Sequence, residues 1–250
     1  MMKRFKQTMM ALSLAISIVV MLASSAFAAT TVNYKILSVK EGDTGVLYDG
    51  PVTVSDGSTV FAALKKISDD SSGSLKPITL TYSGSGAGLY VSAINGASDK
   101  KYPSAYYAGW MYRVNNDLLS YSADDPTGAV LHNGDDVTWY YASPAQTYFT
   151  KINSTAVNGS TLTANVTAEK FEDVINWDLS GFDNLAGATV VAEKGGVKQT
   201  ATTDSNGNAV FTGLGSGTWK VWVQDKYYTS GDLTDAIEHT KSSVSTVTIP

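Results

Sequence analysis

Apolar and polar residues alternate along most of this chain, which is the pattern of half-buried β-strands. The clearest case is residues 109–116, Gly-Trp-Met-Tyr-Arg-Val-Asn-Asn, where the alternation ends in a turn pair. Residues 31–39 and 137–141 alternate in the same way, and residues 41–43 and 133–135 supply Gly and Asp for turns between strands. We therefore expect the N-terminal part to be rich in strands.

One stretch has a different period. Val60, Leu64 and Ile67 recur at helical spacing within residues 59–67, and Ser58 or Thr59 could serve as the N-cap. This predicts one short amphipathic helix packed on the strands, an α+β arrangement. The glycines at 84, 86 and 88 do not have the spacing of a dinucleotide-binding fingerprint.

The C-terminal part is rich in Thr, Val and Asn and contains several short alternating runs with turn residues between them. The predicted strands are residues 160–167, 188–193, 198–203, 208–211, 218–224 and, as a last edge strand, 243–249. Regular short strands of this kind indicate an antiparallel β-sandwich. The predicted fold class is thus mainly β, with an α+β N-terminal domain and a C-terminal sandwich.

The first 28 residues have the pattern of a secretory signal peptide. Lys3, Arg4 and Lys6 precede an apolar run, and Ala26-Phe27-Ala28 offers the small residues of a cleavage site. A retained membrane anchor is the alternative, but the apolar run is short for a bilayer span. We expect cleavage before Ala29, a secreted or cell-surface location in a bacterium, and no membrane span in the mature chain.

Composition narrows the classes of partner. The chain has no cysteine, so no disulfide can staple a small domain and each domain must bury its own core. Without Lys3, Arg4 and Lys6, 15 basic residues face 23 acidic residues, a formal charge of −8. This charge argues against nucleic acid and against an anionic membrane surface as partners.

Catalytic patterns are missing from the sequence. It contains no Gly-x-Ser-x-Gly elbow and no His-Glu-x-x-His motif, and both His132 and His239 are predicted to lie in solvated positions. Residues 204–208 favour a hairpin turn over a calcium loop, because the glycine comes too early and no bidentate Glu follows. Lys170 could form an isopeptide staple, but no matching Asn stands in the last strand. We expect no catalytic site, no metal and no enzyme activity.

Aromatic residues crowd into the N-terminal part. Trp110 and Tyr112 lie on one face of their predicted strand, with Met111 and Arg113 on the other. Trp110 and Tyr112 are either ordinary core residues or the lining of a surface. The alternation alone leaves both interpretations open.

Four motifs in order carry a family resemblance: the helix at 60–67, Gly-Leu-Tyr-Val at 88–91, the strand at 109–115, and Asn-Gly-Asp at 133–135. Over residues 32–142 they resemble the C-terminal domain of the transcobalamin and intrinsic factor family in its bacterial stand-alone form, DUF4430, a β-grasp-like fold. The resemblance implies a domain that covers one face of a corrinoid. It makes Tyr90, Trp110 and Tyr112 candidate ligand contacts, with Tyr106 and Tyr107 next to them, and cobalamin a candidate ligand rather than a cofactor.

A second resemblance lies in the C-terminal part. Residues 187–191, the turn at 204–207 and residues 214–223 resemble carboxypeptidase regulatory-like or collagen-adhesin B-type modules, which are transthyretin-like sandwiches. The predicted plan is a signal peptide at 1–28, a transcobalamin C-terminal-like domain at 29–142, a linker at 143–150 and a sandwich at 151–250.

These expectations favour a secreted, non-enzymatic binding module. The resembled vitamin carriers hold their ligand between this domain and a helical barrel, which this chain lacks, so cobalamin or another flat ligand would need a partner. The alternative is a structural or adhesive protein, or a filament subunit, that assembles by β-strand addition through its edge strands. Its partners would be other extracellular or cell-wall proteins or further copies of itself.

Overall fold

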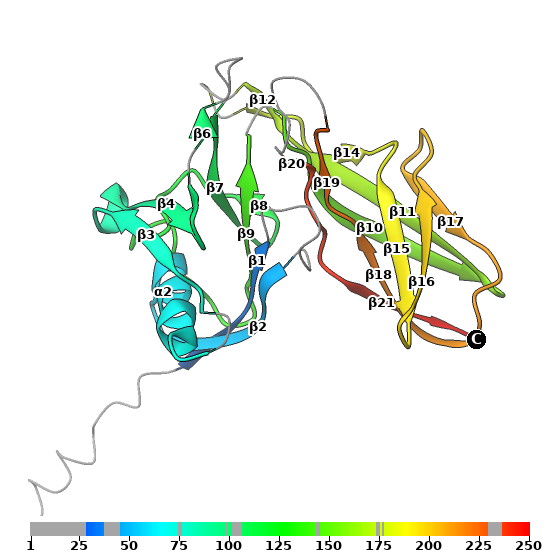
Figure 1. Ribbon diagram of the computed structural model, residues 1–250, viewed down its shortest axis with the longest axis horizontal. Coiled ribbons are helices and arrows are strands. Elements are labelled where there is room, and N and C mark those ends of the chain that lie inside the picture. Colours follow the sequence, from blue (N-terminus) through cyan, green and yellow to red (C-terminus); the bar gives the residue numbers. More distant parts are fainter. Residues whose placement is uncertain are drawn as a thin grey trace, which may run out of the picture.

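The computed structural model describes residues 29–37, 46–74, 77–98, 100–101, 107–143, 146–173, 176, 178–229 and 237–250. The predicted signal peptide, the predicted turn at 41–43 and Tyr106 lie outside these residues. We call residues 29–143 the N-terminal part and residues 146–250 the C-terminal part; they lie side by side in Figure 1.

The N-terminal part is built on a sheet with strand order β2-β1-β9-β7-β6, in which β8 also pairs with β7. Its strands are β1 (Ala29–Leu37), β2 (Val46–Ser55), β6 (Lys100–Lys101), β7 (Tyr107–Val114), β8 (Asp117–Leu118) and β9 (Asp136–Ala142). β1 and β9 run parallel, with Tyr34 opposite Val137, whereas the other pairs are antiparallel. The elements between β1 and β9 supply the long connection that a parallel pair requires.

Local sequence explains the ends and edges of these strands. β7 stops at Asn115 and Asn116, whose φ angles of 53° and 73° lie in the left-handed region that Asn tolerates better than most residues. The chain then reverses into β8, as the turn pair predicted. Pro51 lies in β2, at the edge of the sheet, where a residue without an N–H breaks no hydrogen bond between strands.

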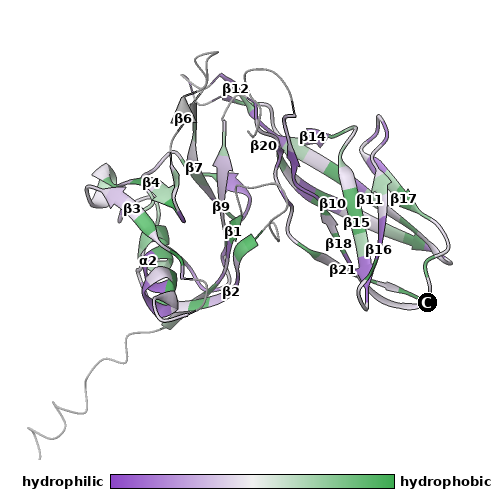
Figure 2. Cartoon of the chain, in the orientation of Figure 1, coloured by the Kyte–Doolittle hydropathy of each residue, from purple (hydrophilic) through white to green (hydrophobic). Residues whose placement is uncertain are grey.

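Among the described residues there is one α-helix, α2 (Val60–Ser71), and it packs on one face of this sheet (Figure 1). Thr59 is its N-cap, because its hydroxyl accepts a 3.2 Å hydrogen bond from the backbone N–H of Ala62. The helix runs about one turn beyond the predicted end, through a polar segment in which Asp69 and Asp70 pair with Lys65 and Lys66 of the preceding turn. Figure 2 shows the mixed hydropathy expected of an amphipathic helix.

A small second sheet, in the order β3-β4-β5, adjoins the helix. Its strands are β3 (Leu80–Ser83), β4 (Tyr90–Ile94) and β5 (Ala97–Ser98), and a single 3-10 turn, η1 (Gly86–Gly88), leads into β4. The glycines that precede β4 therefore form a defined turn.

The C-terminal part is a sandwich of two antiparallel sheets. One sheet contains β10 (Phe149–Asn158), β11 (Thr161–Glu169), β14 (Asp183–Asn184) and β17 (Asn208–Phe211). The other has the order β16-β15-β18-β21 and contains β15 (Thr189–Lys194), β16 (Val197–Thr202), β18 (Gly217–Val223) and β21 (Ser245–Ile249). Short pairs are formed by β12 (Phe171–Asp173) with β13 (Asp178–Leu179), and by β19 (Lys226–Tyr227) with β20 (Ile237–His239). β21 is an edge strand, as predicted.

Each part has its own apolar core. One cluster lies between α2 and the N-terminal sheet, and a second fills the sandwich around residues such as Leu162 and Trp219. Tyr227 and Ile237 of the C-terminal part pack into the first cluster, so the two parts share an interface. The architecture confirms the predicted fold class, mainly β with one helix on a sheet and a separate sandwich. The domain boundaries remain predictions.

Candidate functional site

A groove in the N-terminal part is lined by residues of β4, β7, β8, β9 and the segment that follows β8. Its volume is about 320 Å³. The lining residues are Leu89, Tyr90, Val91, Trp110, Met111, Tyr112, Leu118, Leu119, Ser120, Tyr121, Ser122, Ala123 and Trp139. This set contains aromatic and aliphatic side chains and two serines, and no ionisable acid or base other than tyrosine.

β7 supplies two aromatic side chains of the wall. Trp110 and Tyr112 point to the same side of the strand, as their spacing requires, and they are 9% and 7% exposed. Trp110 Nε1 donates to the Ala97 carbonyl at 2.8 Å, and the Tyr112 hydroxyl donates to the Tyr121 carbonyl at 2.8 Å. Burial raises the pKa of Tyr112 well above its ordinary value, so the hydroxyl stays a donor at all physiological pH values.

A chain of hydrogen bonds holds the floor of the groove. Trp139 Nε1 donates to the Tyr34 hydroxyl at 2.6 Å, and this hydroxyl donates to the Val60 carbonyl at the start of α2 at 2.9 Å. Burial raises the pKa of Tyr34 as well, which keeps it neutral. The Tyr112 and Trp139 rings lie 5.3 Å apart at 32°. The floor is therefore rigid, and its polar atoms already have protein partners.

Two exposed tyrosines form the rim. Tyr90 and Tyr121 are 53% and 51% exposed, far more than the other tyrosines of the wall and floor. The Tyr121 ring lies directly on Gly128, where a Cβ atom would come within 2.2 Å of Tyr121 Cγ. Glycine at position 128 leaves the room that the Tyr121 ring needs in this position.

The segment that carries Tyr121 is tied to the helix and to η1. The Asp124 carboxylate accepts from the Thr59 hydroxyl at 2.8 Å and from the Gly86 N–H at 2.7 Å. The Ser122 hydroxyl donates to the Gly86 carbonyl at 2.9 Å and to the Leu89 carbonyl at 3.1 Å. These bonds hold the two sides of the groove at a fixed separation.

This arrangement is suited to apolar contact and stacking. A ligand would gain mainly from burial of apolar surface, because most of the hydrogen-bonding atoms in the wall are occupied. No acid–base pair faces the groove. Among the residues that the structure describes, no group of three His, Cys, Asp or Glu is placed to hold a metal ion, and no helix is long and apolar enough to cross a membrane.

Three of the five predicted contacts meet in the groove. Tyr90, Trp110 and Tyr112 line it together, and Trp110 and Tyr112 also belong to the core cluster, so the two interpretations of this strand are compatible. Tyr107 lies in β7, but its side chain is not described, and Tyr106 lies outside the described residues. Contact of any of these residues with a ligand stays a prediction.

The sequence analysis missed Tyr121 and Gly128. Tyr121 follows Leu118 and Leu119, two apolar residues placed directly after a turn, and that pattern was the available signal. The contact with Gly128 joins two positions in an irregular segment, where no period predicts which residues meet.

The two histidines behave differently. The side chain of His132 is 81% exposed beside the turn at 133–135, as expected. The predicted solvated position of His239 is wrong, because His239 lies in β20 and is 3% exposed, with its ring against Tyr148. Residues 204–208 form the predicted turn, in which Asp204 accepts from the N–H groups of Asn206 and Asn208.

Comparison with known proteins gives one family match. Residues 57–143 match the model of a family described as a domain of unknown function, DUF4430, which confirms that part of the resemblance. The resemblance of the C-terminal part to carboxypeptidase regulatory-like modules stays a prediction. No curated protein matches the chain.

Among solved structures, the chain is similar to haptocorrin in complex with Cbi, with 20% identity and a TM-score of 0.34. The similarity covers 46% of this chain and 26% of the haptocorrin chain. Because identity and TM-score are this low, the ligand named for haptocorrin does not transfer to this chain.

Proposed function

We propose that this chain is a secreted, non-enzymatic binding module that holds part of a flat, largely apolar ligand in the groove between Tyr90 and Tyr121. The observation that carries the proposal is the groove itself: a rigid aromatic floor, two exposed aromatic residues at the rim and no charged side chain. Such a surface favours a ligand with an extended apolar face.

The ligand class that we propose is a corrinoid such as cobalamin. The support is the motif resemblance of the N-terminal part together with the flat, aromatic character of the groove. A volume of about 320 Å³ lies at the lower end of the range for ligand sites and is much smaller than a corrinoid. The groove would therefore cover one side of the ligand, and a partner protein would cover the rest.

Isothermal titration calorimetry of the mature chain with cobalamin tests this function. We expect measurable binding that weakens at least tenfold, ~1.4 kcal/mol, in Tyr121→Ala and in Tyr90→Ala, because each substitution removes an aromatic contact. Tyr48→Ala, on β2 away from the groove, is the matched control and should bind like the wild type. Absence of binding at millimolar cobalamin would exclude a corrinoid as the ligand. Equal binding by all three variants would exclude the groove as the binding site.

A second candidate function is structural, and β21 favours it. This strand has the sequence Ser-Thr-Val-Thr-Ile, with neither a charge nor a proline, and in the described part of the chain it pairs with β18 alone. Edge strands that do not associate usually carry a charge or a proline, as β2 carries Pro51. An unprotected edge can accept a strand from another molecule.

Sedimentation velocity across a range of protein concentrations tests the structural function. Truncation of β21 is unsuitable, since Val247 and Ile249 are buried in the sandwich. The double variant Thr246→Lys/Thr248→Lys keeps both core residues and adds charge to the exposed face of the strand. We expect concentration-dependent assembly in the wild type and a monomer in the double variant; a wild type that stays monomeric throughout excludes strand addition.

A further inference from the structure

The face of the N-terminal sheet opposite α2 carries an unusual row of polar residues. Alternation sends Tyr34 and Trp139 toward the helix, so Lys35, Thr138 and Arg113 point to the other face. These three residues are direct neighbours in the sheet, because Lys35 pairs with Thr138 and Thr138 pairs with Arg113. The C-terminal part covers this face, so two cationic side chains lie at the interface.

The two cations have different surroundings. Arg113 is paired with Glu169 of the C-terminal part at 2.6 Å. Lys35 is 8% exposed, and its ammonium group donates one hydrogen bond, to the Ser243 hydroxyl at 2.9 Å. No carboxylate of the described residues lies within salt-bridge distance of Lys35, although Asp49 stands directly opposite on β2. A buried ammonium group without a countercharge is costly.

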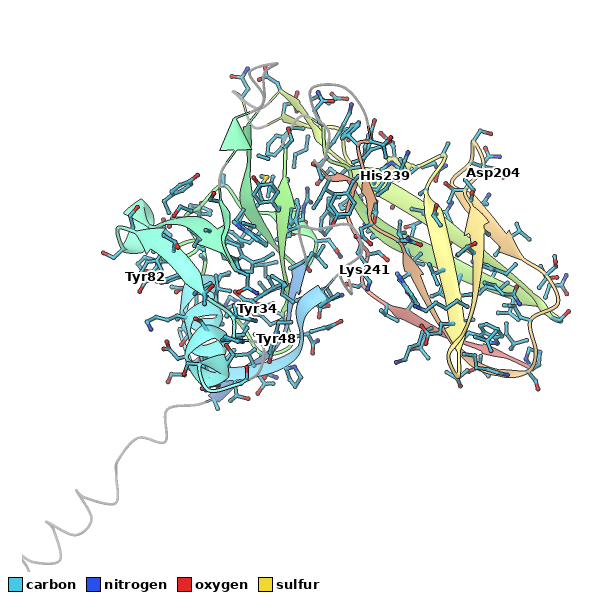
Figure 3. The ribbon with its side chains drawn as sticks, in the orientation of Figure 1. Tyr34, Tyr48, Tyr82, Asp204, His239 and Lys241 are labelled. Carbon is cyan, nitrogen blue, oxygen red and sulfur yellow. The ribbon has the colours of Figure 1, made fainter. Side chains whose placement is uncertain are left out.

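The space beside Lys35 is hollow. Two adjoining cavities of about 310 Å³ and about 140 Å³ lie between the sheet and the segment around Ser243, and they share Asp136, Thr138 and Ser243 in their walls. Lys35 lines the larger cavity, and Lys151 and Lys241 line the smaller one. Figure 3 places Lys241 between the two parts of the molecule.

The residues that line the two cavities include three lysines and two carboxylates, Asp49 and Asp136. The Asp136 carboxylate already accepts from Asn33 Nδ2 at 2.8 Å, and Lys241 has the acidic neighbours Asp225 and Glu193 outside the cavities. The pKa of Lys35 is lowered, and burial is the largest cause. Asp49 and Asp136 oppose this effect, and Lys241 adds to it. Among the described residues, Asp49 and Asp136 thus favour the charge of Lys35 without forming an ion pair with it.

We propose that the two adjoining cavities, together called the cleft, form an anion-binding site. It takes a small oxyanion, a phosphate or a carboxylate group, with Lys35 as the central contact and Lys241 and Lys151 in the wall. The ammonium group has N–H donors beyond the one given to Ser243, and a compact point charge of this kind is suited to an oxyanion. The cleft lies on the opposite face of the sheet from the helix and is lined by residues distinct from those of the groove. It is thus independent of the proposed ligand groove.

Direct binding of inorganic phosphate, followed by phosphorus NMR, and of acetate, followed by carbon-13 NMR, tests this proposal at neutral pH with chloride as the ionic-strength control. We expect the wild-type chain to bind at least one of the two anions, and its melting temperature to rise with that anion beyond the rise in chloride. The two arms distinguish a phosphate site from a carboxylate site. Binding of neither anion beyond chloride would overturn the proposal.

The central variant is Lys35→Met, and its control is Lys66→Met. Lys66 is an exposed lysine of α2 whose loss removes the same charge far from the cleft. We expect Lys35→Met to bind the anion at least about tenfold more weakly and to melt no lower than the wild type in chloride, because the substitution removes an uncompensated buried charge. Lys66→Met should bind as the wild type does.

A second variant keeps the test decisive if Lys35→Met does not fold. Lys241→Met removes a partly exposed cation from the wall of the cleft. We expect anion affinity to fall severalfold in this variant without loss of fold. Unchanged affinity in a folded Lys35→Met variant, or in Lys241→Met when Lys35→Met is unfolded, would contradict an anion site in this cleft.

Discussion

Arg113 Nη1 lies 2.6 Å from Glu169 Oε2, and this ion pair joins β7 of the N-terminal part to β11 of the C-terminal part. The two side chains are 2% and 10% exposed. The Arg113 guanidinium also lies 4.3 Å from the centre of the Phe149 ring, and its Nε donates to the Tyr140 hydroxyl at 3.2 Å. Burial disfavours the charge, but Tyr140 and Glu169 outweigh it and raise the pKa of Arg113.

Loss of the Glu169 charge should destabilise the whole chain. In Glu169→Gln the shape is kept, but the buried Arg113 guanidinium loses its countercharge. We expect the free energy of unfolding in urea to fall by about 3 kcal/mol, with little change in the denaturant slope. Glu172→Gln, an exposed position three residues along the chain, should leave the unfolding curve unchanged.

A double variant separates charge from packing at the same site. Replacing both residues, Arg113→Met and Glu169→Met, removes the uncompensated charge and should restore most of the stability lost in Glu169→Gln. A Glu169→Gln variant as stable as the wild type would show that the ion pair contributes little to the interface.

His239 should make stability depend on pH. Burial lowers the pKa of His239 to about 4, an effect that Glu238 partly opposes. The unfolded chain, with an ordinary histidine pKa near 6.5, binds a proton more readily than the folded chain. Stability from this group is therefore fully present above pH 6.5 and is lost as pH falls toward 4, by up to about 3 kcal/mol.

Urea unfolding between pH 4 and pH 7 measures this effect against two variants. His239→Phe keeps a ring against Tyr148 and should flatten the pH dependence. His132→Asn, at the exposed histidine, should follow the wild type at every pH. Identical pH profiles for His239→Phe and the wild type would contradict a neutral, buried His239.

Gly128 should control the shape of the ligand groove. A methyl group at this position would overlap the Tyr121 ring, so Gly128→Ala should displace the ring from the rim. We expect cobalamin affinity to fall about tenfold while the melting temperature changes little, because the ring is half exposed. Gly73→Ala, at a glycine with open space around it, should bind as the wild type does. Unchanged affinity in Gly128→Ala would mean that Tyr121 does not contact the ligand.

Local patterns in the sequence predicted the local structure well. Alternation located β7, β9 and β21, and the polar residues before Val60 narrowed the N-cap to Ser58 or Thr59, of which Thr59 is the N-cap in the structure. Alternation carries no information on strand direction, so the parallel pairing of β1 with β9 could not be predicted. β10 was missed because its outer half is exposed on both faces and shows no alternation of burial.

Contacts between residues far apart in the sequence could not be predicted from it either. Arg113 and Glu169 are 56 residues apart, and His239 packs against Tyr148, which is 91 residues before it in the chain (239 − 148). Such pairings depend on how two separately predicted units pack, which no local period encodes. The groove residues on β7 were within reach of the sequence because strand alternation fixes which of them share a face.

Proton–nitrogen-15 NMR of the tryptophan indole N–H groups tests the central claim, a ligand groove in the N-terminal part, most directly. Trp110 and Trp139 lie in the groove, whereas Trp219 belongs to the core of the sandwich and Trp222 lies on the same strand, β18. On addition of cobalamin we predict that the indole signals of Trp110 and Trp139 shift while those of Trp219 and Trp222 stay in place. Shifts confined to Trp219 or Trp222, or no shift at all, would contradict the groove as the binding site.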